Sequence, residues 1–248
     1  MTDLSLLQSL ALPAIYLLAG ATKGLVGMGL PTVAVGLTSL FASPAEAAAL
    51  VVVPSLVTNL WQMVDGRHLV PLLRRLWPLL AGIVAGTAVG ALLTTEGLRE
   101  WARPALGLVL LIYALHGVRT AGHRLPERWD SWAGAAAGVA TGLITVATGV
   151  FIIPAVPYLQ ALGLSKEALV QALGLSFTVS TVALAGALAG LGPLDAHSLL
   201  LSALATLPAL VGMLAGRRLR AAMDATRFRR CVFLGLGGLG LHLLAQAL

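Results

Sequence analysis

The sequence contains few charged residues. Only 10% of its 248 residues are Asp, Glu, Lys or Arg, whereas 58% are hydrophobic. An average soluble domain has roughly 25% charged residues, which cover its surface. A soluble fold is therefore excluded, and we expect membrane lipid to surround an apolar exterior.

Cysteine is also nearly absent. The single cysteine excludes an intrachain disulfide framework and a zinc cluster built from cysteines. The sequence has no phosphate-binding loop, no metal-ligand cluster and no Ser, His and Asp set at one depth, so we expect no cofactor, no metal and no enzymatic activity. The N-terminus, Met1 to Asp3, lacks a basic stretch, so we expect no cleavable signal peptide.

Apolar runs fill most of the chain. A run of about 20 apolar residues can cross a bilayer as a helix. Residues 4–42 and 132–162 are longer stretches, each with an interruption. The other predicted segments are 45–64, 76–95, 103–118, 165–190, 196–216 and 229–247. We therefore predict an all-α polytopic membrane protein with eight to ten membrane segments.

Two parts of the chain resemble each other. Residues 20–62 match residues 138–184, with Gly24 opposite Gly142. Further on, Gly86, Gly90, Arg103 and His116 recur 126 residues later, as Gly212, Gly216, Arg229 and His242. We therefore predict two repeats, each an interrupted helical hairpin followed by three transmembrane helices. The predicted division is a first repeat over 1–118, a connector over 119–131 and a second repeat over 132–248.

The net charge of +6 would suit a nucleic-acid partner, but the basic residues lie in short loops between apolar runs, so we expect none. If each interrupted stretch crosses the membrane once, the loops on the two faces carry six and nine basic residues. If each is a hairpin that returns to its own face, they carry thirteen and two. Cytoplasmic loops collect Lys and Arg, so the hairpins are favoured. The halves are then inverted, with a cytoplasmic connector and both termini outside the cytoplasm.

The glycine-rich interruption of the first stretch is a predicted substrate site. Irregular backbone at membrane depth is tolerated where it lines a polar cavity. Gly24, Gly27 and Gly29 would let a ligand approach the backbone. Pro31 suits the first turn of a helix over about 30–42, whose N-terminal end would attract an anion.

The second interruption has hydroxyl groups, because Thr145 and Thr148 flank Gly149. Its arms, 132–146 and 148–162, have about 15 residues each. We expect the two interruptions to form one anion site near the middle of the membrane. The alternative is that their glycines serve only close helix packing.

Polar residues near the interruptions are further candidates for substrate binding. Lys23 is either a fixed cation for an anionic substrate or a side chain that reaches the cytoplasmic interface. Asn59 and Gln62 lie one turn apart on one helix face, and the matching region of the second repeat holds Ser180 and Thr181. These four residues either line a pathway or form hydrogen bonds between helices.

Other polar residues have simpler interpretations. Residues 43–46, Ser-Pro-Ala-Glu, are typical of a helix start, which favours a capping role for Glu46 over proton coupling. His116 and His242 could relay protons, but both lie near helix ends. Glycine occupies every fourth position over 82–90, which allows close helix contact within the chain or at a homodimer seam.

At these residues the chain resembles the TauE/SafE family of sulfite exporters. The resemblance covers essentially the full length and rests on residues 23–31 (KGLVGMGLP), 43–47 (SPAEA), 59–62 (NLWQ) and the pair Gly86 and Gly90. In the second repeat, Thr145 and Ala147 stand where the first has Gly27 and Gly29. The family implies transport of sulfite, sulfonates or related organosulfur anions across the bacterial inner membrane.

These observations predict a secondary transporter of a small anion that works by alternating access between two repeats. The resemblance implies sulfite or an organosulfonate as the anion. An intramembrane enzyme is an alternative, but it needs paired catalytic groups at one depth. A non-transporting membrane protein that assembles with partners is another, but it needs longer polar loops.

Overall fold

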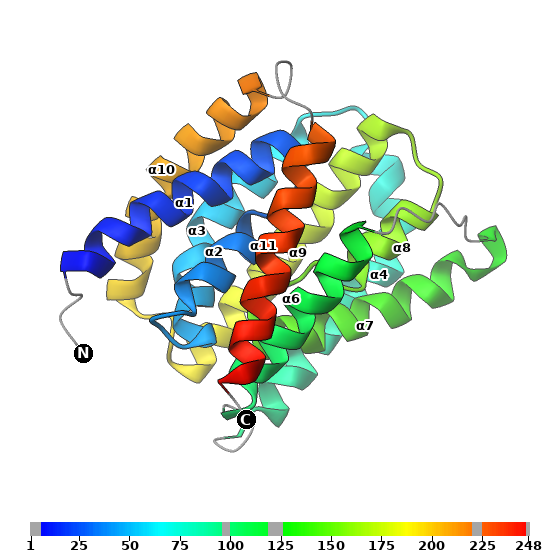
Figure 1. The fold of residues 1–248 in the computed structure, drawn as a ribbon. Helices are drawn as coiled ribbons and strands as arrows, with labels where there is room; N and C mark the ends of the chain where they lie inside the picture. Colours follow the sequence, from blue (N-terminus) through cyan, green and yellow to red (C-terminus); the bar gives the residue numbers. More distant parts are fainter. Residues whose placement is uncertain (1–5, 96–99, 119–125, 220–224, 247–248) are drawn as a thin grey trace.

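Helices make up nearly all of the described structure. The computed structural model describes residues 6–95, 100–118, 126–219 and 225–246, and these ranges contain ten α-helices and no strand. The helices of the first half are α1 (Leu6–Val26), α2 (Leu30–Thr38), α3 (Pro44–Val64), α4 (Leu69–Leu93) and α6 (Ala102–Val118). Those of the second half are α7 (Asp130–Thr148), α8 (Ala155–Ala161), α9 (Lys166–Leu191), α10 (Ala196–Leu219) and α11 (Ala225–Ala245) (Figure 1).

Five helices, α3, α4, α7, α9 and α10, are long and apolar enough to cross a membrane. Shorter apolar helical segments lie in α1, α6 and α11. The prediction of an all-α protein is confirmed for the described residues, and the long apolar helices support several membrane crossings. The predicted segments 45–64, 103–118 and 165–190 agree closely with α3, α6 and α9. α4 begins at Leu69, seven residues before the predicted position 76, because the helix continues through Arg74 and Arg75, which interrupt the apolar run. Arg75 pairs with Asp130 at 2.6 Å.

Each interrupted stretch contains one long and one short helix rather than two equal arms. α1 has 21 residues and α7 has 19, so each is about 30 Å long, which is about the thickness of the hydrocarbon core. α2 has nine residues and α8 has seven, which is too short to cross. The predicted arms 132–146 and 148–162 are therefore wrong in length, because α7 runs from Asp130 to Thr148 and residues 149–154 are not helical.

A glycine in the left-handed region ends each long helix. Gly27 has φ 89° and Gly149 has φ 72°, values that residues with a Cβ rarely adopt. The two glycines are 122 residues apart (149 − 27), whereas the sequence match placed Gly24 opposite Gly142, 118 apart. The match is therefore one turn out of register. Glycines recur every fourth residue on these helices, so a slip of four residues preserves the pattern.

This register corrects two further matches. If residues 122 positions apart are equivalent in the two halves, Lys23 corresponds to Thr145 rather than to Thr141. Gly149, and not Thr145, then stands where the first half has Gly27.

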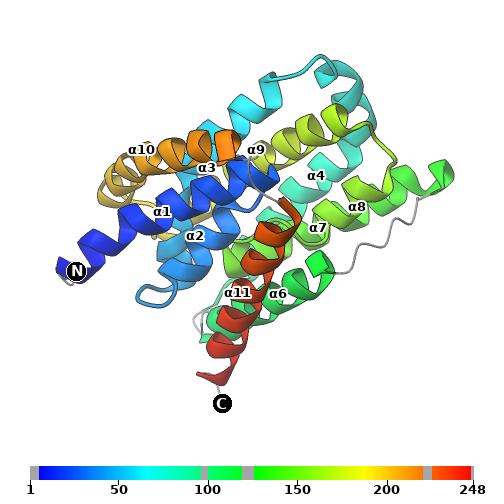
Figure 2. The ribbon, with the colours of Figure 1, turned by 45° about the horizontal axis from the view of Figure 1, so that its top comes forward.

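Helices of the two halves pack against each other in a regular way. α1 lies alongside α10 and α4 alongside α7, whereas α3 packs against α9 and α6 against α11 (Figures 1 and 2). The α1–α10 pair is parallel, since Gly20 faces Ala209 and Gly24 faces Met213. The α6–α11 pair is antiparallel, since Gly107 faces Leu244 and Gly237 faces Ala114.

Small residues let these helices touch. A Cβ on Gly212 would lie 2.0 Å from the carbonyl oxygen of Leu17, and one on Gly86 would lie 2.2 Å from that of Val139. A side chain at either glycine would force the helices apart. The glycines over 82–90 therefore serve an internal contact with α7 and not a dimer seam.

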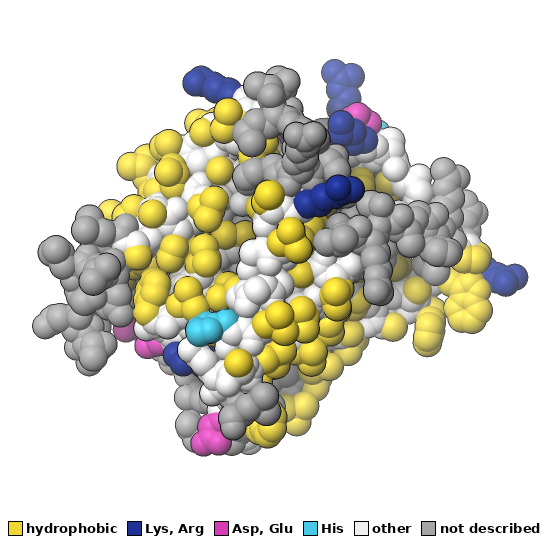
Figure 3. Space-filling view, viewed as in Figure 1, with side chains coloured by type: hydrophobic (Ala, Val, Ile, Leu, Met, Phe, Trp, Pro, Cys, Tyr) yellow, Lys and Arg dark blue, Asp and Glu magenta, His cyan; other side chains and the backbone are white. Residues whose placement is uncertain are grey.

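The charged groups divide the molecule into two ends. One end, called the basic end below, carries most of the exposed Lys and Arg side chains that Figure 3 shows. The helix ends and connections on this side carry the exposed residues Arg67, Arg74, Arg75, Arg128, Lys166, Arg217, Arg218 and Arg230. At the opposite end lie the start of α1 and the end of α11 (Figure 1). Hydrophobic side chains cover the surface between the two ends.

Candidate functional site

α2 lies inside the helical bundle. Eight of its nine residues are buried. Gly29 precedes the helix with φ 105°, and Pro31 lies in its first turn. Glycine tolerates that left-handed backbone, and proline lacks the N–H that has no partner there. These residues fix the start of α2 beside the end of α1.

Lys23 points into the protein. Its side chain is only 4% exposed, and its Nζ donates to Thr58 Oγ1 at 3.1 Å and to Asn59 Oδ1. Asn59 Nδ2 in turn donates to Thr181 Oγ1 at 3.4 Å. This network joins α1, α3 and α9. The side chain of Lys23 is therefore held inside the bundle, unlike the expected alternative in which it extends to a membrane interface.

The charge of Lys23 has no acidic partner in the described residues. Both acceptors of Nζ are neutral oxygens, and the salt bridge formed in the described part of the chain joins Arg75 and Asp130. A charged group inside a membrane protein costs at least about 2.5 kcal/mol. An anion bound next to Nζ would offset that cost.

Buried hydroxyl groups without a partner lie close to this network. Ser55 is one turn before Asn59 on α3, and Ser180 is the neighbour of Thr181 on α9. Ser176 lies one further turn along α9. All three are fully buried, and their Oγ atoms form no hydrogen bond within the described ranges. An unsatisfied buried hydroxyl costs about 1–3 kcal/mol, so these groups favour a bound polar ligand or water.

We call this set the polar layer; it consists of Lys23, Ser55, Thr58, Asn59, Ser176, Ser180 and Thr181. The layer lies near the middle of the bundle. Thr181 follows Gln171 by ten residues on α9, which is about 15 Å along the helix axis. Gln171 contacts the exposed α3–α4 connection at the basic end. The layer is therefore about half a hydrocarbon thickness from that end.

Ser55 and Ser176 were missed in the sequence, as was Thr32, whose buried hydroxyl also has no partner among the described residues. Serine and threonine are common in membrane helices, so single residues give little signal. The available clue was that polar residues recur at the spacing of one helix face, at positions 55, 59 and 62 on α3 and at 176 and 180 on α9.

Glutamine side chains close the basic end of the site. Gln62 Nε2 donates to the carbonyl oxygens of Gly27 at 3.1 Å and Val170 at 2.9 Å. Gln171 Nε2 donates to Met63 O at 2.8 Å. Gln62 therefore connects the end of α1 with α3 and α9, and its amide donors are occupied.

The second interruption is not part of the polar layer. Thr145 Oγ1 donates to Thr141 O at 2.6 Å, and Thr148 Oγ1 donates to Ile144 O at 2.7 Å. The N–H of Ala155, at the start of α8, donates to Thr141 Oγ1 at 3.1 Å. The hydroxyls expected to bind substrate thus satisfy backbone groups of their own segment.

The two interruptions also lie at different heights in the bundle. Gly27 accepts from Gln62 near the end of α3, whereas Gly149 lies beside Ala48 near its start. Ala48 and Gln62 are fourteen residues apart, which is about 21 Å along the axis. The expected joint site at mid-depth is therefore not formed. The reason is that α1 and α7 each extend about 30 Å before they break, so each break lies near one end of the bundle.

Gly24 also has a different role from the one expected. A Cβ there would lie 2.2 Å from Met213 O, so Gly24 permits close packing of α1 on α10 rather than ligand approach. A Cβ added at Gly27 would meet no atom within 4 Å, and one added at Gly29 would have only Thr22 nearby, at 3.3 Å. Pro31 is buried in the first turn of α2.

The remaining polar candidates lie outside the layer. Glu46 forms a capping box with Ser43, as expected: Ser43 N donates to Glu46 Oε2 at 2.8 Å, and Glu46 N donates to Ser43 Oγ at 3.2 Å. His242 is exposed near the end of α11. The side chain of His116 lies outside the described part of the structure.

Comparison with known proteins shows a similarity to one described family. The family model described as "Sulfite exporter TauE/SafE" matches residues 12–243, a range that includes every residue of the polar layer. No curated protein and no solved structure matches the chain.

Proposed function

Because the chain belongs to the TauE/SafE sulfite exporter family, we propose that it is a secondary transporter that binds a small sulfur anion at the polar layer. The family and the apolar helices together support a multi-pass membrane transporter of sulfur anions. The observation that carries the binding site is Lys23, a buried cation whose partners are neutral oxygens.

The hydrogen-bonding groups of the polar layer suit an oxyanion. The ammonium of Lys23 has three donors, of which Thr58 and Asn59 take two. The hydroxyls of Ser55 and Ser180 can each donate one more hydrogen bond. Sulfite and sulfonates present oxygen acceptors to such donors. A substrate of either type would also neutralise the charge.

An inverted relation between the halves accounts for the position of the layer. α1 and α10 have different positions in their repeats and pack parallel, whereas α6 and α11 have the same position and pack antiparallel. A two-fold axis in the membrane plane would produce this pattern. Asn59 and Thr181, which share a hydrogen bond, are 122 residues apart, as are Gly27 and Gly149. The substrate would thus bind where repeat 1–118 meets repeat 132–248.

The proposed topology follows from the charges. The basic end, with the connector 119–131, would face the cytoplasm of a bacterial inner membrane, and both termini would lie on the other side. Substrate would move as the pairs α1–α10 and α4–α7 rock about the polar layer.

Flux into proteoliposomes tests this proposal. Purified protein should support saturable sulfite uptake that methanesulfonate inhibits, while protein-free liposomes should not. Ser55→Ala and Ser180→Ala should each weaken the apparent affinity about tenfold or more, since a hydrogen bond to a charged group is worth about 1.5–3 kcal/mol. Thr206→Ala, on α10 outside the layer, is the matched control. Absence of both uptake and ligand-induced stabilisation with every sulfur anion would reject the proposal.

A further inference from the structure

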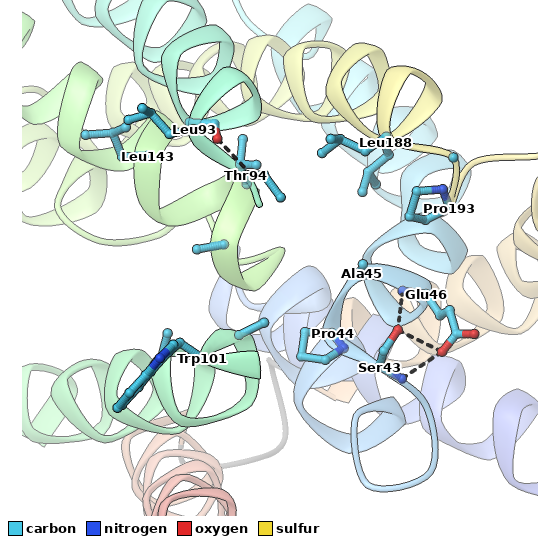
Figure 4. Close-up of a pocket in the computed structure, with 17 residues that line it drawn as sticks. Ser43, Pro44, Ala45, Glu46, Leu93, Thr94, Trp101, Leu143, Leu188 and Pro193 are labelled. Carbon is cyan, nitrogen blue, oxygen red and sulfur yellow. Dashed lines mark hydrogen bonds between the residues drawn. The ribbon is translucent and has the colours of Figure 1, made fainter. Parts of the chain in front are cut away.

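A cavity opens at the end of the bundle opposite the basic end. Its volume is about 750 Å³, and the ends of α3, α4, α6, α7 and α9 enclose it (Figure 4). Pro44, Thr94, Trp101, Ala147 and Leu188 are among its lining residues. The polar layer lies deeper in the bundle. It lies between α3 and α9, which are two of the helices that line the cavity.

Among the described residues that line the cavity, no polar groups are arranged to hold an anion. Its walls are mainly apolar, and the carboxylate of Glu46 is held by the backbone N–H and hydroxyl of Ser43, as Figure 4 shows. Arg103, close to the cavity, donates to Ala42 O at 3.2 Å. A small anion would therefore pass through this space rather than remain there.

An apolar cluster separates the cavity from the polar layer. It consists of Ala48, Ala49, Val52, Leu184 and Leu188, each at most 5% exposed. Leu188 both lines the cavity and belongs to the cluster. We call this cluster the apolar seal.

The apolar seal is thin. Leu188, Leu184 and Ser180 occupy successive turns of α9 on one face. Residues four positions apart on a helix are about 6 Å apart along its axis. On α9, Leu184 is therefore the one residue of this face between Leu188 in the cavity wall and Ser180 in the polar layer. On α3, Ala48 and Val52 occupy the corresponding turns before Ser55.

We infer that the cavity is the outer vestibule of the transport path and that Leu184 and Leu188 form the gate that closes it. This inference rests on the proposed function, because it takes the polar layer as the binding site. A dry apolar constriction stops an ion, since the ion would have to lose its water without gaining a partner. Together with the glutamine contacts at the basic end, the seal leaves the polar layer closed on both sides.

Cysteine labelling tests the gate without requiring transport. The natural Cys231 is first replaced by Ser, and Ser180→Cys then reports access to the polar layer. Ala147→Cys, in the cavity wall, reports access to the vestibule. The probe is 2-sulfonatoethyl methanethiosulfonate, an anion that does not cross membranes, applied to the outer face of intact cells.

The vestibule cysteine should react rapidly and the Ser180→Cys variant at least tenfold more slowly. Adding Leu184→Ala should raise the rate at Ser180→Cys at least tenfold, whereas Leu234→Ala, at an exposed position on α11, should not change it. Leu184→Val and Leu188→Ala should each raise the labelling rate by a smaller factor. If Leu184→Ala does not fold, these two variants test the gate in its place.

Two results would overturn the inference. An unreactive cysteine at position 147 would mean that the cavity does not hold water. An unchanged rate at Ser180→Cys in all folded seal variants would mean that the seal is not the barrier. Neither result depends on sulfite uptake, so a failure of the gate is distinguishable from a failure of the proposed function.

Discussion

Replacement of Lys23 by Met should separate substrate binding from stability. Lys23→Met keeps the length of an unbranched side chain but removes the charge. The side chain is 4% exposed and donates to Thr58 and Asn59. The polar layer therefore loses its cation and its ammonium donors, while the volume beside α3 stays nearly filled.

The size of the effect on binding follows from the lost interaction. A hydrogen bond between a charged donor and an anion contributes about 1.5–3 kcal/mol. At 1.4 kcal/mol per tenfold change, sulfite should bind about 10- to 150-fold more weakly. The stability of the ligand-free protein should change little or increase. The buried charge and its desolvation cost disappear, although the Oδ1 of Asn59 loses a partner.

The assay measures thermal unfolding of purified protein across a range of sulfite concentrations. A ligand that binds only the folded state raises the unfolding temperature, so the midpoint of the increase reports the affinity. Lys166→Met serves as the control, because Lys166 is exposed in the first turn of α9. Uptake into proteoliposomes provides a second readout.

A purely structural Lys23 would behave differently. Unfolding of Lys23→Met at a clearly lower temperature, together with unchanged sulfite affinity in the folded fraction, would refute the reasoning. The same conclusion would follow if Lys166→Met weakened binding as strongly as Lys23→Met.

Other substitutions test the fold. Gly149→Ala should destabilise by about 1–3 kcal/mol, since φ is 72° and the new Cβ would lie 2.7 Å from that of Ala48. Gly190→Ala, with open space around it, should not lower the unfolding temperature. Ser198 donates to the Asp195 carboxylate and holds its pKa below the ordinary value. This cap therefore stabilises the start of α10 at neutral pH and is lost as the pH falls through the folded-state pKa, a dependence that Asp195→Asn should abolish. An NMR titration of Asp195 at or above the ordinary pKa would contradict that account.

Much of the fold could be predicted because the relevant physics is local. Apolar runs of membrane length predicted the positions of α3, α6 and α9, and the order Ser-Pro-Ala-Glu predicted the capped start of α3 at residue 44. The bend at Gly27 and the start of the next helix at Leu30 also followed from local residue types, but that helix ends at Thr38 rather than near residue 42.

The register and depth of the interruptions depend on long-range packing and could not be predicted. Glycines four residues apart allow two alignments of α1 with α7, and only the observed helix ends distinguish them. Gly24 was expected at a ligand site, but its position against Met213 in α10 is a tertiary property.

The candidate site was partly predictable, because the sequence shows the types of its residues but not the contacts between them. Lys23 and Asn59 stood out as polar residues within apolar stretches, and Thr181 occupied the position matching Asn59. The sequence does not show that these side chains meet, nor that Gln62 turns toward Gly27 and Val170 instead of the layer.

A crystal structure with selenite, a heavier analogue of sulfite, would test the central claim most directly. The anomalous signal of selenium locates the anion without prior assumptions. We expect a selenium peak beside Lys23, between Asn59 on α3 and Ser180 on α9, with a selenite oxygen within hydrogen-bonding reach of Lys23 Nζ. A peak beside Thr148 and Gly149, or only among the exposed arginines of the basic end, would contradict the account.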